Sequence, residues 1–396
     1  MRRLTFIALS LAMSLFTANL GFAPSASAES AQPKDWTLLI FLNGNNSLDS
    51  FGEMNLKQLE TIGSTANINI VVQWASLKTK TIKRMLIKKS TNSSTVTSPV
   101  VEMVKADMGD WHAIGDFVKW GAEHYPANHY FLDLWDHGSG WHSKNSPGKI
   151  NDISWDELTG NHITTREMGL ALQDSAKIIG HKVDVLASDA CLMAMVEVAN
   201  EVSDSVSVFA GSQDTEPGAG WPYDKFFARW SAKPKATAQD VSKMLSEEYA
   251  KSYEASGQKV TFSSYDLNNF PAFNQAIKAF AASMKGMSAA NAKLALKAAQ
   301  KSQYFTNDDY VDLVDFLANM SALHVSSLDV NQVNNINKAL SKFVITSNNV
   351  KFPKAHGVSI WIPNDSSTLH QYSSIYSQLK FDTETHWSDF LKGLTQ

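Results

Sequence analysis

The sequence predicts an α/β fold in which a mostly parallel sheet is flanked by helices. Apolar segments of strand length alternate with helical patterns up to about residue 230, and this alternation is typical of βαβ units. The strand-like segments are apolar throughout, which indicates a sheet that is covered on both faces. Helical patterns dominate after residue 230, so we expect a largely helical C-terminal part.

The predicted elements follow one another in a regular order. Buried strands are expected at 36–42, 69–76, 130–135, 183–188 and 206–212, with a more polar edge strand or hairpin at 83–90. Between the strands, Asp110 is placed to cap one helix, and Thr164 and Glu167 form a capping box for the next. A further helix is expected to start directly after Cys191.

The C-terminal part contains two strand-like segments among its helices. They lie at 259–267 and 356–363. Either segment could return to the main sheet or contribute to a small second one, and the pattern leaves both arrangements open. The segment 310–320 has the spacing of a helix.

The first 28 residues have the pattern of an export signal. Arg2 and Arg3 precede an apolar stretch over 4–22, and small residues lead up to Glu29. An uncleaved membrane anchor is the alternative interpretation. Elsewhere no stretch approaches the roughly 18 apolar residues that a membrane span needs, so we expect a mature form without a membrane span. The predicted location is outside the cell, in a periplasm or at the cell envelope.

The charge balance argues against one class of partner. Removing the two arginines of the signal lowers the count of lysine plus arginine from 35 to 33 against 39 acidic residues, so the net charge changes from −4 to −6. Proteins that bind nucleic acid usually carry a basic surface, so no nucleic-acid partner is expected.

Cys191 is the only cysteine of the 396 residues. An exported protein can form disulfides, but a single cysteine has no internal partner. A leftover cysteine suggests an intermolecular bond or a reactive thiol, whereas the alternative is a small buried apolar side chain.

Ligands of an open parallel sheet bind beyond the carboxyl ends of its strands. His137 and Gly138 follow the strand 130–135, and Cys191 follows the strand 183–188. If these strands are parallel neighbours, His137 can take the thiol proton, and the helix after Cys191 would lower the thiol pKa. The N–H groups of Gly138 and Cys191 could then hold the oxyanion of an acyl intermediate.

Asp189 lies two residues before Cys191, about 6.6 Å away along a strand. A buried carboxylate there would be costly without a partner, and a cationic substrate side chain would remove that cost. Arginine would be favoured over lysine by bidentate pairing. In the alternative interpretation, Asp189 pairs with an internal arginine or caps the following helix.

Other enzyme classes fit the sequence less well. A metal hydrolase would use His137 and His142, with Asp136 as an optional third ligand, but these histidines lie in a glycine turn and lack the helical zinc spacing. A serine hydrolase is disfavoured because HGSG is not the G-x-S-x-G motif. A non-catalytic scaffold that binds peptides or surface polymers is the more serious alternative.

The segments WDHGSGW and SDACLMAMVEVA together resemble the clostripain family of cysteine peptidases, which has a caspase-like fold. Supporting similarity lies in WTLLIFLNGNNSLD, GSQDTEPGAGWPYD and HGVSIWIP, so the resemblance runs from about residue 36 to 363. It implies a His137–Cys191 dyad and cleavage after basic residues, with Asp189 in the substrate pocket. The implied organisation is a signal peptide over 1–28, a caspase-like catalytic core over 29–230 and a C-terminal region over 231–396.

The resemblance also implies several finer features. Asp224 is the candidate for a second pocket acid, and Lys144 and Lys149 are candidate self-cleavage sites in the loop between His137 and Cys191. The expected partner is a peptide or protein substrate with a basic residue before the scissile bond. Some members depend on calcium, but NGNNSLDS is a poor calcium loop because its side chains are mostly neutral. No metal or cofactor is predicted.

Overall fold

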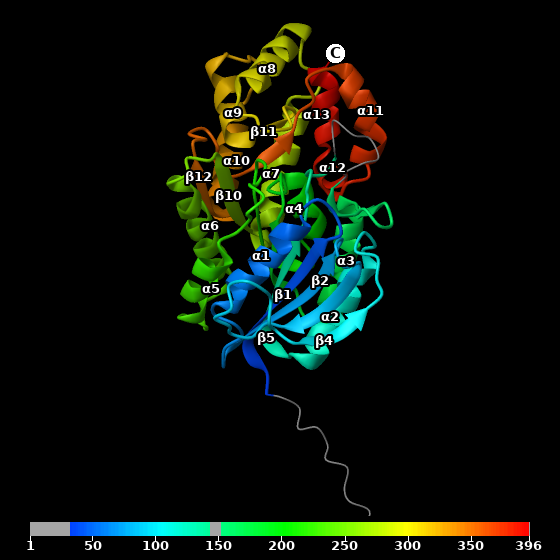
Figure 1. The fold of residues 1–396 in the computed structure, drawn as a ribbon. Coiled ribbons are helices and arrows are strands. Elements are labelled where there is room, and N and C mark those ends of the chain that lie inside the picture. Colours follow the sequence, from blue (N-terminus) through cyan, green and yellow to red (C-terminus); the bar gives the residue numbers. More distant parts are fainter. Residues whose placement is uncertain (1–31, 143–151, 396) are drawn as a thin grey trace, which may run out of the picture. The chain divides into compact units, whose positions relative to one another are not determined.

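The computed structural model describes residues 32–142 and 152–395, and these belong to one compact unit. A nine-stranded sheet runs through it in the order β12-β10-β9-β8-β5-β1-β2-β3-β4 (Figure 1). The strands are β1 (Lys34–Gly44), β2 (Ile68–Ser76), β3 (Thr81–Leu86), β4 (Val100–Val104), β5 (Ala127–Trp135), β8 (Val183–Asp189), β9 (Val206–Gly211), β10 (Val260–Asp266) and β12 (Val344–Val350).

The five central strands are parallel and the outer ones are antiparallel. Strands β2, β1, β5, β8 and β9 pair in parallel, whereas β3 and β4 at one edge and β10 and β12 at the other run antiparallel to their neighbours. The predicted mostly parallel α/β sheet is therefore confirmed.

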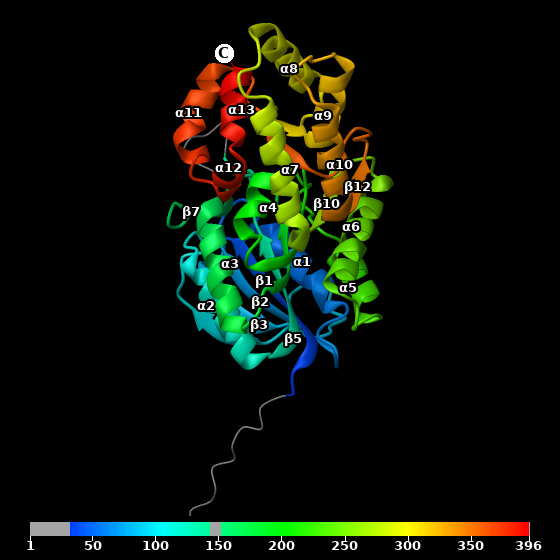
Figure 2. The same ribbon diagram turned by 180° about the vertical axis from the view of Figure 1, so that it is seen from behind.

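Helices cover both faces of this sheet, as the continuous apolar strands indicated (Figures 1 and 2). Alternate residues of β1 belong to different cores: Leu39 and Phe41 pack on one face, and Leu38 and Ile40 on the other. The first face is covered by α2 (His112–His124), α3 (Thr165–Ile179) and α4 (Val196–Val202). The second is covered by α1 (Asp49–Glu60), α5 (Tyr223–Ser231) and α6 (Ala238–Glu254).

The C-terminal part is largely helical, as predicted. Its helices are the 3-10 turn η1 (Leu267–Asn269), α7 (Phe270–Ser283), α8 (Ala289–Lys301), α9 (Leu313–Ala322), α10 (Val330–Phe343), α11 (Ser366–Tyr376), α12 (Lys380–Thr385) and α13 (Trp387–Leu394). A small sheet of β11 (Tyr310–Asp312) with β13 (Ser359–Trp361) lies in this part, and a second one, of β6 (Ile153–Asp156) with β7 (Asn161–Ile163), lies between β5 and α3 in the chain.

The two strand-like segments of this part have different fates. The first becomes β10 and extends the main sheet, and the second contributes β13 to a small sheet. The segment 310–320 is only partly helical, because its first three residues pair with β13 before Asp312 caps α9 through the N–H groups of Val314 and Asp315. The capping box of Thr164 and Glu167 is present at the start of α3, as predicted.

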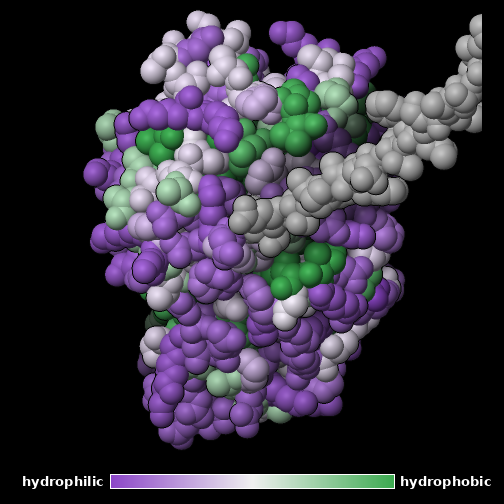
Figure 3. Space-filling view, turned by 90° about the horizontal axis from the view of Figure 1, so that it is seen from below, coloured by the Kyte–Doolittle hydropathy of each residue, from purple (hydrophilic) through white to green (hydrophobic). Residues whose placement is uncertain are grey.

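Figure 3 shows the molecule from below, relative to the view of Figure 1. This face is mostly hydrophilic, with a few hydrophobic areas. Within the described ranges, no helix has the length and hydrophobicity that a membrane crossing requires. The expected export signal over 1–28 and the candidate cleavage sites Lys144 and Lys149 lie outside the described residues.

Candidate active site

His137 and Cys191 follow strands that are direct neighbours in the sheet. Strands β5 and β8 are parallel, and Trp135 lies opposite Asp189 in their register. The pairing continues past the strand ends, because the Asp136 N–H donates to the Asp189 carbonyl at 3.3 Å. Extending this register by two residues would place His137 opposite Cys191.

Gly138 packs directly against the backbone of Cys191. A Cβ atom added to Gly138 would lie 2.5 Å from the Cys191 carbonyl oxygen and 3.2 Å from its nitrogen, so only glycine fits without a shift. Among the described residues, neither the Gly138 N–H nor the Cys191 N–H donates a hydrogen bond. Two free N–H groups beside a nucleophile are able to hold a developing oxyanion.

The prediction of a helix directly after Cys191 was wrong. Helix α4 begins only at Val196, and Leu192 has a left-handed backbone with φ 65°. The N–H groups of Leu192 and Ala194 instead donate to the carbonyls of Asp214 and Ser212, at 3.1 and 2.9 Å. Cys191 therefore lies in a turn five residues before the helix, too far for a helix N-terminus to lower its pKa appreciably.

The thiol and the imidazole are both neutral at neutral pH. Burial raises the pKa of Cys191 to about 12, although the Glu216 N–H donates to its Sγ at 3.3 Å and partly opposes this effect. Burial also lowers the pKa of His137 below its ordinary value of 6.5. A neutral His137 is able to accept a proton, and Cys191 needs such a base because its own thiolate is scarce.

Asp189 lies at the centre of a buried acidic cluster. Its side chain accepts hydrogen bonds from the Trp221 N–H at 3.2 Å and from the Tyr223 hydroxyl at 2.9 Å. The same hydroxyl lies 2.6 Å from Asp133, and the carboxyl of Glu216 is close enough to interact electrostatically with Asp189. We call Asp133, Asp189 and Glu216 the acidic cluster.

The loop before α5 closes over this cluster. Gly220 has φ +61°, and a Cβ atom there would lie 2.7 Å from a carboxylate oxygen of Asp189. The Tyr253 hydroxyl donates to the Gly220 carbonyl at 2.7 Å and holds the loop in place. The close approach of the Gly220 backbone therefore forms one wall around Asp189.

No cation compensates the acidic cluster within the described part of the chain. Burial raises the pKa of Asp189 to about 6, and burial together with neighbouring carboxylates raises the pKa of Asp133 and of Glu216 well above their usual values. The Oε2 atom of Glu216 is buried and has no hydrogen-bond donor among the described residues. The alternative in which Asp189 pairs with an internal arginine is not realised among these residues.

Asp224 does not join the acidic cluster. Its carboxylate pairs with Lys225 at 3.0 Å in the first turn of α5, and no described contact links it to Asp189. Its neighbour Tyr223 reaches Asp189 instead. Sequence reasoning missed Asp133 and Glu216, although a carboxylate inside the apolar strand 130–135 was a usable signal for Asp133.

Ser47 is a further residue that sequence reasoning did not assign. Its Oγ lies 3.0 Å from Nε2 of His137. His142 belongs to a different, buried group, where its Nε2 lies 3.7 Å from Asp309 and its ring packs against Tyr310 and Tyr372. Within the described ranges, no three His, Cys, Asp or Glu side chains are grouped as metal ligands would be.

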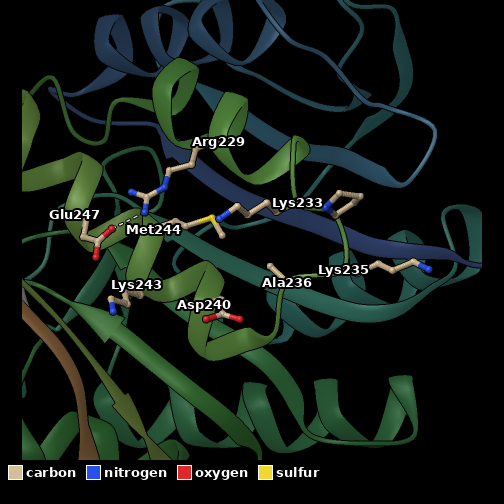
Figure 4. Close-up of a pocket in the computed structure, with 9 residues that line it drawn as sticks. Arg229, Lys233, Lys235, Ala236, Asp240, Lys243, Met244 and Glu247 are labelled. Atoms are coloured by element: carbon tan, nitrogen blue, oxygen red, sulfur yellow. Dashed lines mark hydrogen bonds and ion pairs between the residues drawn. The ribbon is translucent and has the colours of Figure 1, made fainter.

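A separate pocket of about 670 Å³ lies between α5 and the start of α6 (Figure 4). Its lining residues are Arg229, Lys233, Pro234, Lys235, Ala236, Asp240, Lys243, Met244 and Glu247. Arg229 turns toward Glu247 and pairs with it (Figure 4). The residues that line the pocket include no cysteine and no histidine, so it is not the candidate active site.

The sequence model of the clostripain family (peptidase C11) matches residues 40–393. The chain belongs to the clostripain family of cysteine peptidases. A curated member, clostripain of Hathewaya histolytica, is 25% identical over 336 residues, which are 72% of this chain and 61% of the relative. The chain thus spans about 61% of the length of that relative.

Solved structures of family members have the same fold. A secreted C11 cysteine protease from Bacteroides thetaiotaomicron, in complex with an irreversible peptide inhibitor, matches with a TM-score of 0.68 at 21% identity, over 89% of this chain and 99% of that one. An inactive zymogen C11 protease from Parabacteroides distasonis matches with a TM-score of 0.69 at 18% identity, over 89% and 98%. The caspase-like fold expected from the resemblance is confirmed.

The contact of Gly138 with Cys191 yields a testable prediction. Gly138→Ala should lower the free energy of unfolding by about 1–3 kcal/mol, because the new methyl group overpacks a rigid backbone contact. Gly115→Ala is the matched control, because nothing lies within 4 Å of its added Cβ in α2; it should be neutral or stabilise by up to about 1 kcal/mol. Urea unfolding measures both, and a Gly138→Ala variant as stable as the wild type would contradict the packing argument.

Proposed function

We propose that the chain is an exported cysteine endopeptidase that cleaves peptide bonds after basic residues, with arginine favoured over lysine. One observation carries the proposal: the only thiol of the chain lies beside a buried acidic cluster that has no cationic partner among the residues that the structure describes. Burying carboxyl groups without a partner costs stability. A positively charged substrate side chain would offset this cost when it binds, so the buried acids can be explained as a binding site for a basic residue.

The proposed chemistry uses the groups around the two strand ends. Neutral His137 removes the proton of Cys191 as the sulfur attacks the peptide carbonyl, so the new thiolate charge passes to the carbonyl oxygen. The N–H groups of Gly138 and Cys191 stabilise that oxyanion, and each such donor typically contributes about 3 kcal/mol. The imidazolium then protonates the leaving amine, and water hydrolyses the acyl-enzyme with His137 as base.

The acidic cluster would form the pocket for the residue before the scissile bond. A guanidinium group presents several donors in a plane and matches Asp189 and a second carboxylate better than an ammonium does. Glu216 is a better candidate than Asp224 for that second acid, because it is buried and interacts electrostatically with Asp189, while Asp224 pairs with Lys225. We propose this role for Glu216.

Export and maturation complete the proposal. Residues 1–28 would be removed as a signal peptide, leaving the catalytic core over 29–230 and the C-terminal region over 231–396. Cleavage at Lys144 or Lys149 would mature the chain, because an enzyme of this specificity accepts lysine. The Bacteroides relative is described as secreted, which supports export here.

Peptidase activity is tested with fluorogenic peptides that contain arginine. The mature protein should hydrolyse them, should be stopped by iodoacetamide and should lose activity in Cys191→Ala while keeping its melting temperature. A zinc chelator should have no effect. Inhibition by the chelator but not by the alkylating agent would contradict the cysteine mechanism, and an intact fold without any hydrolysis would favour the non-catalytic, peptide-binding alternative.

Specificity is tested by neutralising one acid at a time. Asp189→Asn should lower kcat/KM for an arginine reporter by about 100-fold, since a buried charge pair loses one partner. Asp224→Asn is the matched control and should change kcat/KM by about twofold at most, because exposed ion pairs contribute little. Equal effects of the two substitutions would show that Asp189 is not the pocket acid.

The raised pKa of Asp189, about 6, predicts how ligand affinity depends on pH. The carboxyl is neutral below pH 6 and charged above it, so a cationic ligand should bind more tightly as the pH rises. Benzamidine stays charged over this range, and its affinity should increase roughly tenfold between pH 5 and 7.5. Calorimetry measures this increase, and it should disappear in Asp189→Asn. If the wild type bound benzamidine with the same affinity at all these pH values, Asp189 would not be the group that titrates in this range.

A further inference from the structure

The turn after β1 is anchored beneath His137 by amide side chains. Asn43 donates to Oδ2 of Asp136 at 2.9 Å, and Asn46 donates to Oδ1 of the same residue at 2.6 Å. Both amides also reach the carbonyl of Trp155 at 2.9 Å. Asp136 in turn accepts the backbone N–H of His137 at 2.6 Å. The turn and the His137 backbone therefore share a single buried carboxylate.

Ser47 is held at a defined place within this turn. The Leu48 N–H donates to the side-chain oxygen of Asn46 at 2.9 Å, which closes a local turn around Ser47. Asn46 itself is buried, whereas Ser47 is exposed and points its hydroxyl at the imidazole, 3.0 Å from Nε2. The buried amides thus set the position of a hydroxyl that is itself on the surface of the site.

The contact between Ser47 Oγ and Nε2 of His137 bears on which ring nitrogen can act as the base. A neutral imidazole carries one proton, and the nitrogen without it accepts. If the Nε2–H donates to Ser47, Nδ1 keeps its lone pair. Among the described residues Nδ1 of His137 has no hydrogen-bond partner, so it is available to the thiol proton. A hydroxyl also accepts well from the imidazolium that forms after the transfer.

We propose that Ser47 is a positioning residue that accepts the Nε2–H of His137 and keeps Nδ1 as the acceptor of the Cys191 proton. The inference rests on the proposed His137–Cys191 dyad. The titratable group that acts on the ring is Glu157, whose charge favours the imidazolium; Asp136 holds the backbone of His137 and not its ring. Neither occupies Nε2, so among the described residues the hydroxyl of Ser47 is its only hydrogen-bond partner.

The test compares Ser47→Ala with Ser47→Thr, which keeps the hydroxyl at an exposed position. Ser47→Ala should lower kcat for an arginine reporter by about 10- to 100-fold, with KM changed by about twofold at most. The reason is that hydrogen bonds to charged groups are strong, and the bond from Nε2–H to Ser47 gains this strength only when proton transfer charges the ring. Ser47→Thr should stay within about threefold of the wild type. Ser50→Ala, at an exposed position in the first turn of α1, is the matched control and should be unchanged.

A second readout follows the thiol itself. Cys191 is the only cysteine, so the rate of alkylation by iodoacetamide reports on this site alone. At each pH between 5.5 and 8, the alkylation rate of Ser47→Ala should be about tenfold or more below that of the wild type and should approach that of His137→Ala. The pH profile of Ser47→Thr should follow that of the wild type.

Two outcomes would overturn the inference. In the first, Ser47→Ala keeps the wild-type kcat and alkylation profile. In the second, Ser47→Ala and Ser47→Thr are equally impaired, which indicates a merely structural role. Failure of the proposed function looks different, because a wild-type chain that cleaves no peptide still shows whether thiol alkylation depends on Ser47.

Discussion

The in-register parallel pairing of β5 with β8 is the constraint on which the candidate site depends. Because Trp135 lies opposite Asp189, the residues that follow both strands lie at the same edge of the sheet. A slip of one residue would turn every side chain of a strand to the other face. The buried apolar residues of both strands oppose such a slip, so the core that stabilises the sheet also sets the geometry of His137 and Cys191.

The electrostatics of the site follow from that burial. The thiol, the imidazole and the acidic cluster are all shifted toward their neutral forms. A protonated thiol and a neutral imidazole avoid the cost of buried unpaired charge. Under the proposed function, the substrate supplies the missing positive charge beside Asp189, and the thiolate of Cys191 forms only when a base takes its proton.

The sequence alone predicted the mostly parallel sheet and the positions of His137 and Cys191 after two of its strands, because apolar runs, a capping box and motif positions are local signals. It was not sufficient for the acidic cluster. Asp133, Glu216 and Tyr223 come from β5, a loop and α5, and only the tertiary fold brings them to Asp189. The helix start was misplaced for a similar reason: the carbonyls of Ser212 and Asp214 capture N–H groups that a local pattern assigns to a helix.

The asparagines of NGNNS are understandable in the same terms. Carboxylates at these positions would repel the buried Asp136, whereas amides donate to it and leave their oxygens for the turn. The segment that makes a poor calcium loop is thus well suited to hold a hydroxyl against His137. The lone cysteine fits this arrangement, because a second thiol nearby could consume the nucleophile by forming a disulfide in an oxidising compartment. Under the proposed function, the resting site keeps one protonated sulfur and one imidazole nitrogen that can accept its proton.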